Sequence, residues 1–301
     1  MNITYLDKGV KQDLSDVVRN MDHSDTPFSA LIGEEKAIST TFQWKTEGFD
    51  AVDASAAIEG ADAPTAVDNQ GQEYLGYVQI FTNTLSVSGT SLAISTAGST
   101  NKEAHQIELK LKSLKRSVES VYLGGQAKAL GSSSVARKTD SAQTLIDVAN
   151  TKNLAGVGIT EDTLLTHLGD VSMKQAGLFD AVMMMPAVQK VAFDKAMNVN
   201  RAINVDAAKF SDRFSGVSTY TCAFGVFDVI MNPFMRVDTV AKTSDILIFE
   251  PDSFTKHILR PYSYDKLGKK GDKVEYQFIT EQGLSLSHPK AAVLFSSVKY
   301  A

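Results

Sequence analysis

The chain has 301 residues, 43% of them hydrophobic and 22% charged, which is enough to bury a substantial core as one large domain or two smaller ones. A net charge of -5 argues against a dedicated nucleic-acid-binding protein, because such proteins usually carry a strong basic patch. The longest apolar runs fall far short of the roughly 18 to 20 residues of a membrane span, and the N-terminus lacks the pattern of a secretory signal. We therefore expect no membrane helix and a cytoplasmic origin.

The first predicted element is a short helix over residues 27–32. Asp25 or Thr26 can cap it, Pro27 suits its first position, and Gly33 can end it. A helix of barely two turns is marginal alone, so its apolar side chains should pack against another part of the chain. These side chains are Phe28, Leu31 and Ile32.

Two strand patterns follow, over residues 38–44 and 77–90, and a long loop separates them. Alternate positions of the first strand carry Ile38, Thr40, Phe42 and Trp44. One face of the second is expected to carry Val78, Ile80 and Thr82, with Leu85 and Val87 further along. Together the strands and the loop predict a long hairpin-like excursion over residues 38–89.

The loop, residues 47–73, contains seven acids, seven alanines and no lysine or arginine. No apolar face recurs at helical spacing, and a helix is interrupted by Gly48, Gly60, Pro64 and Gly71. Because lysine and arginine stay absent as far as Thr100, residues 47–100 carry a charge of -7 and the rest of the chain sums to +2. The acidic segment therefore has basic surface available elsewhere, on its own chain or on a neighbour's.

The strongest helix signal lies at residues 101–123, where Thr100 and Glu103 have the spacing of a capping box and two glycines follow the last turn. Its length corresponds to a rod of about 35 Å. The apolar stripe consists of Ala104, Ile107, Leu111, Leu114, Val118 and Val121. The other faces, expected to be solvated with ion pairs such as Glu108 with Lys112, carry Lys102, Lys110, Lys112, Lys115, Arg116, Glu103, Glu108 and Glu119.

The remaining chain mixes helices and strands after a serine-rich connection at residues 131–153. Thr160 can cap the next helix, whose apolar stripe is Leu164, Leu168 and Val171 and which Gly177 closes. The predicted helices span residues 160–177 and 186–197. The predicted strands span residues 179–185, 218–225, 226–232, 245–250 and 273–288, the second and third forming a hairpin at Gly225. This order predicts an α+β fold.

The residues that could carry chemistry form no recognisable catalytic or metal site. The five histidines lie far apart, without metal-binding spacing, and no nucleophile elbow, phosphate loop or dinucleotide motif occurs. Residues 267–273, LGKKGDK, favour a basic turn, with phosphate binding as the alternative. The single cysteine, Cys222, excludes an intrachain disulfide and is expected to be a small buried hydrophobe, with a reactive role as the alternative. We therefore expect a structural or binding protein without a cofactor, not an enzyme.

Four segments in order carry a family resemblance: TPFSALIGEEKAISTTFQWKTE, QIFTNTLSVSGT, CAFGVFDVIMNPFM and LGKKGDKVEYQFITEQGLSLSHPKAAV. They resemble the major capsid proteins of tailed bacteriophages, which have the Hong Kong 97-like fold. The resemblance implies an N-terminal arm at residues 1–37, an extended E-loop at 38–90, a peripheral domain at 91–155 with its spine helix at 101–123, and an axial domain at 156–255. Residues 256–301 would return to the peripheral domain and form the C-terminal strands.

The resemblance implies self-assembly, through hexamers and pentamers, into an icosahedral virion shell around double-stranded DNA that is bound without sequence specificity. It further implies synthesis in the cytoplasm of a bacterial host and a portal, with cement or decoration proteins as an open possibility. Since the chain begins at Met1 with no fused scaffold, a separate scaffolding protein is expected. A lysine-to-asparagine cross-link is not expected, because the excursion has no lysine after Lys45. The alternatives are an encapsulin-like nanocompartment, or an unrecognised enzyme or tail protein.

The resemblance also implies that the acidic loop contacts a neighbouring copy. Its contact residues would be Asp50, Asp53, Glu59, Asp62 and Asp68. The candidate basic partners are Lys110, Lys112, Lys115, Arg116, Lys269, Lys270 and Lys273.

Overall fold

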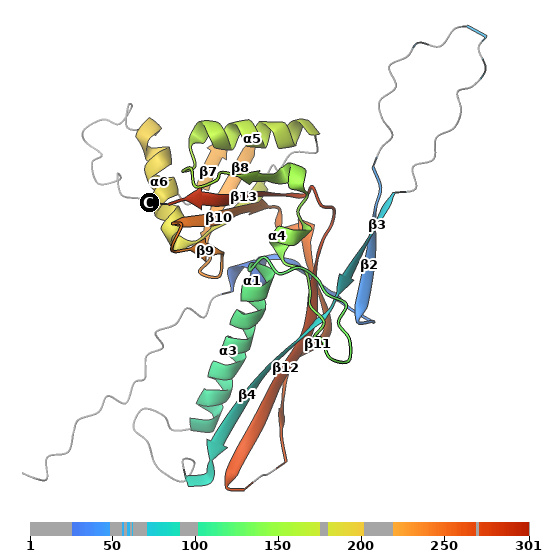
Figure 1. The fold of residues 1–301 in the computed structure, drawn as a ribbon, viewed down its shortest axis with the longest axis vertical. Coiled ribbons are helices and arrows are strands. Elements are labelled where there is room, and N and C mark those ends of the chain that lie inside the picture. Colours follow the sequence, from blue (N-terminus) through green and yellow to red (C-terminus); the bar gives the residue numbers. More distant parts are fainter. Residues whose placement is uncertain are drawn as a thin grey trace, which may run out of the picture.

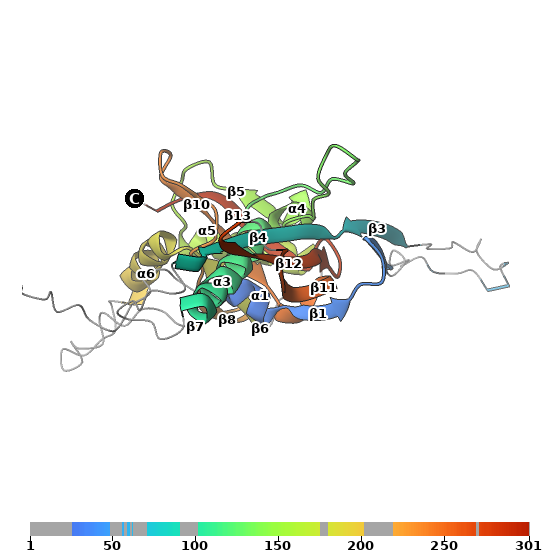
Figure 2. The same cartoon turned by 90° about the horizontal axis from the view of Figure 1, so that it is seen from below.

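A computed structural model describes residues 26–48, 56, 59–60, 62, 71–90, 102–174, 180–201, 219–268 and 271–300 of the chain. Within these ranges the chain forms an elongated sheet, a second sheet beside it and a two-stranded ribbon that leaves the body (Figure 1). The view turned by 90° shows that the body is thin along the direction of sight of Figure 1 (Figure 2). The described part of the molecule is thus a flat plate from which a ribbon projects.

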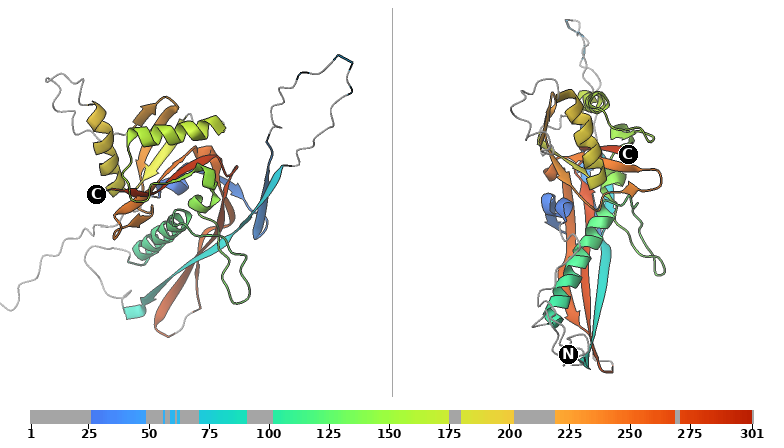
Figure 3. Two further views of the ribbon diagram at one scale, coloured as in Figure 1. Left: turned by 45° about the horizontal axis from the view of Figure 1, so that its top comes forward. Right: turned by 90° about the vertical axis from the view of Figure 1, so that its left-hand side faces the viewer.

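The elongated sheet has four strands, and the long helix α3 (Lys102–Tyr122) lies along it (Figures 1 and 3). In order across the sheet the strands are β1 (Gly33–Lys36), β11 (Phe254–Lys266), β12 (Lys273–Leu286) and β4 (Gln79–Ser88). β1 is parallel to β11, and the other two pairs are antiparallel. The core between α3 and the sheet includes Phe81, Leu85, Leu114, Val118, Tyr122, Tyr276 and Phe278.

The second sheet has seven strands, of which the central ones are buried on both faces. The main path across it is β5 (Thr151–Asn153), β13 (Ala292–Lys299), β10 (Thr243–Phe249), β6 (Asp180–Met185), β8 (Gly225–Met231) and β7 (Thr219–Cys222), with β9 (Val237–Asp238) paired to β10. Helices α5 (Glu161–Lys174) and α6 (Ala187–Arg201) pack on one face through Leu164, Leu168, Phe193 and Met197. The other face joins the α3 core through Val182, Met184, Leu247 and Phe249, so every residue of β10 is buried.

The ribbon consists of β2 (Thr41–Thr46) and β3 (Gln72–Tyr77), an antiparallel pair. It points away from both sheets (Figure 1). The strand after Val78, β4, pairs with β12 instead of β2. The predicted excursion over residues 38–89 is therefore too long at its far end, and its two-stranded part ends at Tyr77. The division of the chain into domains stays a prediction.

Most predicted helices and strands are confirmed with shifted bounds. The first helix is α1 (Pro27–Leu31), and Phe28 and Ile32 are buried in the core with Leu31 packed against it. The hydroxyl of Thr160 accepts a hydrogen bond from the backbone N–H of Thr163 at 3.2 Å, which confirms the predicted cap of α5. β7 and β8 form the predicted hairpin, in which Cys222 pairs with Gly225. Thr100 and Gly177 lie outside the described residues.

The structure corrects several predicted faces. Ile38 is 96% exposed and lies before β2, in the connection from β1. Ile80 and Thr82 are exposed, because α3 packs on the opposite face of β4, where Phe81, Leu85 and Val87 are buried. Ala104 is exposed and Glu119 is fully buried, so the buried face of α3 differs from the predicted stripe at both ends. Cys222 is half-buried.

Several elements were not predicted. The connection at residues 131–153 contains the helix α4 (Ala142–Leu145), the 3-10 helix η2 (Val148–Asn150) and β5, which are too short for a periodic signal. β1 has no buried residue, and β11 combines an exposed half with a register shift beside Pro261, so neither shows a strand pattern. A second 3-10 helix, η4 (Pro251–Ser253), leads into β11. These elements depend on their tertiary neighbours.

Glu119 on α3 explains why the five-residue helix α1 is stable. Its carboxylate accepts hydrogen bonds from the backbone N–H groups of Phe28 (2.7 Å) and Ser29 (2.9 Å), and from the Ser29 hydroxyl. It also accepts one from Nδ2 of Asn232, at 2.8 Å. Thr26 makes no side-chain capping bond, so Glu119 satisfies the unpaired N–H groups at the start of α1. One buried carboxylate thus connects α1, α3 and the segment after β8.

Replacing Glu119→Ala should lower the free energy of unfolding of the unassembled subunit by about 3 kcal/mol or more. Each buried donor left without an acceptor costs about 1 to 3 kcal/mol. The control is Glu108→Ala on the same helix, which removes an exposed pair with Lys112 worth about 0.2 to 0.5 kcal/mol. Urea denaturation measures both, and equal small losses would contradict this role of Glu119.

Candidate assembly interface

At the root of the ribbon, one aromatic side chain fills the space beside two glycines. The ring of Phe42 on β2 stacks on the imidazole of His257 on β11, with centroids 4.0 Å apart. A Cβ atom at Gly76 would lie 2.3 Å from the Phe42 ring, and one at Gly283 would lie 2.7 Å from it. Phe42 therefore fits between β3, β11 and β12 only because both positions are glycine.

The stack continues outward along the ribbon. Trp44, the single tryptophan of the chain, lies 5.8 Å from Phe42 and 5.7 Å from Tyr74 between ring centroids, stacked on both. Phe42 and Trp44 come from β2, and Tyr74 from β3. An isolated two-stranded ribbon is marginally stable, and these aromatic contacts, of which Trp44 with Tyr74 crosses between the strands, supply part of the packing that a sheet would otherwise provide.

A second set of contacts holds the far strand of the ribbon where it enters the body. Nζ of Lys128 donates to the carbonyl of Leu75 at 2.8 Å, and Nε of Arg137 donates to the carbonyl of Val78. Oε1 of Gln79 accepts from Nε2 of Gln126 at 2.7 Å and from the backbone N–H of Thr139 at 3.1 Å. The segment between α3 and α4 thus fixes the junction of β3 and β4.

A buried carboxylate completes this junction. Glu281 on β12 accepts from Nη2 of Arg137 at 2.5 Å and from Nε of Arg260 at 2.8 Å. The Glu281 side chain is only 6% exposed. A buried carboxylate is costly unless it is paired, so Glu281 needs both guanidinium groups. The same bonds hold Arg137 and Arg260 in place. Arg137 in turn holds the carbonyl of Val78 at the base of the ribbon.

Among the described residues, the predicted acids of the loop form no ion pair with the predicted bases of the same chain. Glu59 and Asp62 are exposed, and Asp50, Asp53, Asp68, Lys269 and Lys270 lie outside the described residues. Several candidate bases have contacts on their own chain. Lys112 pairs with Glu108 at 2.6 Å, as predicted, and Lys273 pairs with Glu275. Lys115 lies 5.8 Å from the ring centroid of Tyr262, and Arg116 5.7 Å from that of Phe234. Lys110 is half-buried. The contact between copies stays a prediction.

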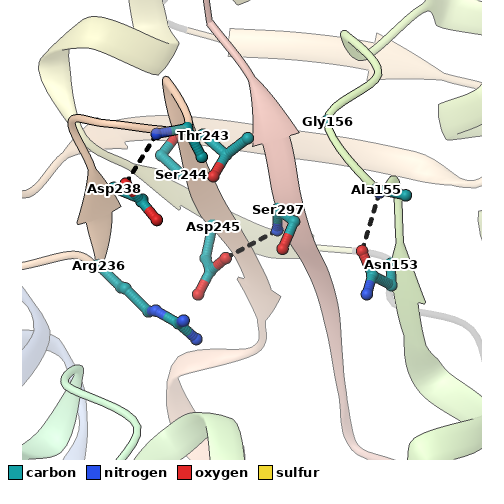
Figure 4. A pocket seen from close by; sticks show the side chains of 10 residues that line it. Asn153, Ala155, Gly156, Arg236, Asp238, Thr243, Ser244, Asp245 and Ser297 are labelled. Carbon is teal, nitrogen blue, oxygen red and sulfur yellow. Dashed lines mark hydrogen bonds between the residues drawn. The ribbon is translucent and has the colours of Figure 1, made fainter.

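Two of the hollows in the described surface are large enough to be candidate ligand sites. One, of about 550 Å³, runs beside the ribbon root between Glu35, Trp44, His257 and Ser287. The other, of about 450 Å³, lies where β9, β10, β13 and the turn after β5 meet (Figure 4). In the latter, Asp245 accepts a hydrogen bond from the backbone N–H of Ser297 at 3.0 Å. Burial raises the pKa of Asp245, and the Ser297 bond, the charge of Arg236 and a bond from Gln143 oppose this rise.

The polar groups that line these hollows contact one another within the chain. In the first hollow, Nε2 of His257 lies 2.8 Å from Oγ of Ser285, and Nδ1 of His257 lies 3.6 Å from the Glu35 carboxylate. The Ser285 hydroxyl also donates to the carbonyl of Thr255 at 3.3 Å.

Asp245 is held by groups of its own chain, and its bonds join β10 to β13 and to α4 through Gln143. Within the described residues, no group of three or more His, Cys, Asp or Glu side chains is placed to hold a metal ion. In the same ranges every helix is too short or too polar to cross a bilayer. Four residues that the sequence pattern does not single out have structural roles, because they fix the ribbon: Gly76, Gly283, Arg137 and Glu281.

Comparisons with known proteins agree with this architecture. A family model described as SU10 major capsid protein matches residues 2–299. The major capsid protein of Escherichia phage Phieco32 is 29% identical over 133 residues, which cover 42% of this chain and 36% of that relative. The match thus spans about a third of the relative's length.

Solved structures share the fold across nearly the whole chain. The capsid of a native GTA particle superposes with a TM-score of 0.71 and 14% identity, covering 98% of this chain and 96% of the other. The holo-SrpI encapsulin complex of Synechococcus elongatus PCC 7942 superposes with a TM-score of 0.64 and 10% identity, covering 97% and 94%. At these identities the likeness concerns the fold alone.

Replacing Gly283→Ala should displace the ribbon root. The new Cβ would also lie 2.7 Å from the carbonyl oxygen of Tyr77, a backbone atom that cannot move without moving β3. We expect a loss of about 1 to 3 kcal/mol and a red shift of the Trp44 fluorescence. Gly268→Ala is the control, because its Cβ would meet nothing within 4 Å. Unchanged fluorescence in Gly283→Ala would contradict the aromatic seat.

The imidazole of His257 should make stability depend on pH. Burial lowers its pKa, and the Glu35 carboxylate, 3.6 Å from Nδ1, raises it by a smaller amount. The ordinary histidine pKa is about 6.5. Since the folded pKa is lower, the stabilisation is complete above about pH 6.5 and is lost as the pH falls through the folded value. His257→Gln should reduce this decline, measured as the urea midpoint from pH 7.5 to 5. Identical slopes in both proteins would rule it out.

Proposed function

The chain belongs to the SU10 major capsid protein family and has the Hong Kong 97-like fold, and from this premise we propose that it assembles into the icosahedral shell of a tailed-phage virion. The shell would enclose double-stranded DNA without sequence-specific contacts. The subunit would be made in the cytoplasm of a bacterial host and act as a structural protein, without catalysis. Its partners would be further copies in hexamers and pentamers, a separate scaffolding protein, a portal and cement or decoration proteins.

One observation carries this proposal: the ribbon leaves the body with its root fixed and its packing incomplete. In the part of the chain that the structure describes, β2 and β3 pair only with each other, and both lie outside the two larger sheets. Two strands do not make an independently stable sheet. The stacked Phe42, Trp44 and Tyr74 and the brace from Lys128 and Arg137 nevertheless hold the ribbon in one direction. A rigid arm that needs further burial suits a lattice in which each copy reaches onto the next.

The flat shape of the body also supports assembly into a shell. A plate whose arm contacts the next plate makes a head-to-tail contact, which generates a closed ring when the rotation closes. Rings of such plates can tile a shell. The acidic charge of the chain, -5, also suits a container whose wall does not hold the genome by electrostatic attraction.

An encapsulin-like shell around protein cargo is the second candidate, because the encapsulin complex shares the fold. Electron microscopy of particles from the natural source, with analysis of their contents, separates the two. Closed icosahedral particles with nuclease-protected double-stranded DNA are expected. Protein-filled particles would favour the second candidate, and a discrete small oligomer with enzymatic turnover would overturn both.

We further propose that the acidic loop contacts basic side chains of a neighbouring copy. Exposed ion pairs contribute only about 0 to 1 kcal/mol each, so the loop would act mainly through backbone pairing and burial, repeated in every copy. The acids are those named above, Asp50, Asp53, Glu59, Asp62 and Asp68, and the candidate bases include those on α3 and near Lys273.

Reversing Asp53, Glu59 and Asp62 to lysine should abolish shell formation and leave the subunit folded, since the two described acids are exposed. The matched control changes the same residues to Asn, Gln and Asn, which removes the charge without reversing it and should weaken assembly less. Sedimentation measures assembly, and circular dichroism measures folding. Normal shells from the triple-lysine variant would refute the acidic contact.

A further inference from the structure

A second feature of the molecule matches the acidic loop in charge: the basic hairpin, defined here as residues 126–138. It contains Lys128, Arg137 and Lys138, and no acidic residue occurs between Glu119 and Asp140. The hairpin stands off the body beside the ribbon, where it is drawn in green in Figures 2 and 3. The sequence pattern predicts only a serine-rich connection at residues 131–153, which overlaps the second half of this hairpin.

The basic hairpin has a defined shape. Ala129 and Lys138 exchange two backbone hydrogen bonds, of 3.1 and 2.9 Å. At the tip the backbone N–H of Ser132 donates to the carbonyl of Val135 at 2.8 Å, and the Ser132 hydroxyl accepts from the Val135 N–H at 3.2 Å. Gly131 has a φ of 78°, which favours glycine. The backbone of the hairpin is therefore held in a defined shape.

The hairpin presents apolar and basic side chains together. Leu130 is 64% exposed and Val135 57% exposed, although both are large and apolar. Lys138 is exposed, and no carboxylate among the described residues forms an ion pair with it. Lys128 is 43% exposed and lies 3.5 Å from Asp140, whereas Arg137 is occupied by Glu281. The surface thus offers two apolar side chains beside one full and one partial positive charge.

The acidic loop repeats the complementary chemistry three times. The triplet of alanine, a branched apolar residue and an acid occurs at residues 51–53 (AVD), 57–59 (AIE) and 66–68 (AVD). Each triplet places an apolar side chain next to a carboxylate, and alanine permits close backbone approach. Lys112 and Lys273 already have acidic partners on their own chain, whereas Lys138 is exposed and has no such partner among the described residues.

We propose that the basic hairpin is the docking surface for residues 47–73 of a second copy. This docking rests on the proposed shell function, and it identifies the basic hairpin as the surface that the acidic loop contacts. A copy's own hairpin is not the target, because the ribbon leads away from the body (Figure 1). The same segment braces its own ribbon through Lys128 and Arg137, so it would couple the arm that a copy extends to the arm that it receives.

Cysteine cross-linking tests the proximity directly. The single native cysteine is first removed by Cys222→Ser. The full chain then carries Val135→Cys and Glu59→Cys, and the assembled particles are oxidised so that neighbouring cysteines form a disulfide. Copies joined head to tail should give a ladder of oligomers on a denaturing gel. The control replaces Val135→Cys by Lys152→Cys, an exposed position on β5, and should give no ladder. Intact shells without a ladder from the first variant would overturn the docking surface.

A charge exchange tests the chemistry. Lys138→Glu with Leu130→Ser should lower the yield of closed shells at least about tenfold, the factor that a modest loss of contact energy produces. Lys152→Glu should assemble normally. A chain that carries Lys138→Glu together with Asp53→Lys, Glu59→Lys and Asp62→Lys should regain assembly, because the two charges are exchanged. Full assembly of the hairpin variant, or no recovery in the combined variant, would overturn the pairing. A wild-type chain that forms no shell would instead overturn the proposed function.

Discussion

The seat of Phe42 between Gly76 and Gly283 is the contact on which the arm of this subunit depends. It joins β2, β3, β11 and β12 at one point, and the ring of His257 closes it from the body side. Because interiors are close-packed, a ring that fills the space above two glycines allows few other positions. The direction of the ribbon is thereby set by packing, and the polar brace from Lys128 and Arg137 fixes its second strand.

The body behind the ribbon is rigid for a related reason. The central strands of the seven-stranded sheet are buried on both faces, and one face of the sheet shares its core with α3 and the elongated sheet. Glu119 adds polar bonds that join α1, α3 and Asn232 across that boundary. A plate of this construction can transmit the position of its arm to its edges, which is what a repeated head-to-tail contact needs.

Elements with a strong period could be predicted from the sequence, and those that depend on neighbours could not. The middle of the α3 stripe, at Leu114 and Val118, and the buried strand around Met184 follow from local pattern, as does the hairpin at Gly225. The pattern could not show that β4 buries Phe81 and exposes Ile80, because the position of α3 decides that face. Nor could it show that Glu119 is buried, since its four donors come from distant segments. The acidic loop was visible at once, whereas the glycine seat and the basic hairpin needed the structure.

The most direct test of this account is a cryo-electron microscopy reconstruction of the assembled full chain in which residues 47–73 are traced. The account predicts a closed shell in which this segment is buried against a neighbouring copy and the ribbon keeps its direction at Phe42. A reconstruction in which residues 47–73 pack on their own body, with no burial between copies, would contradict it.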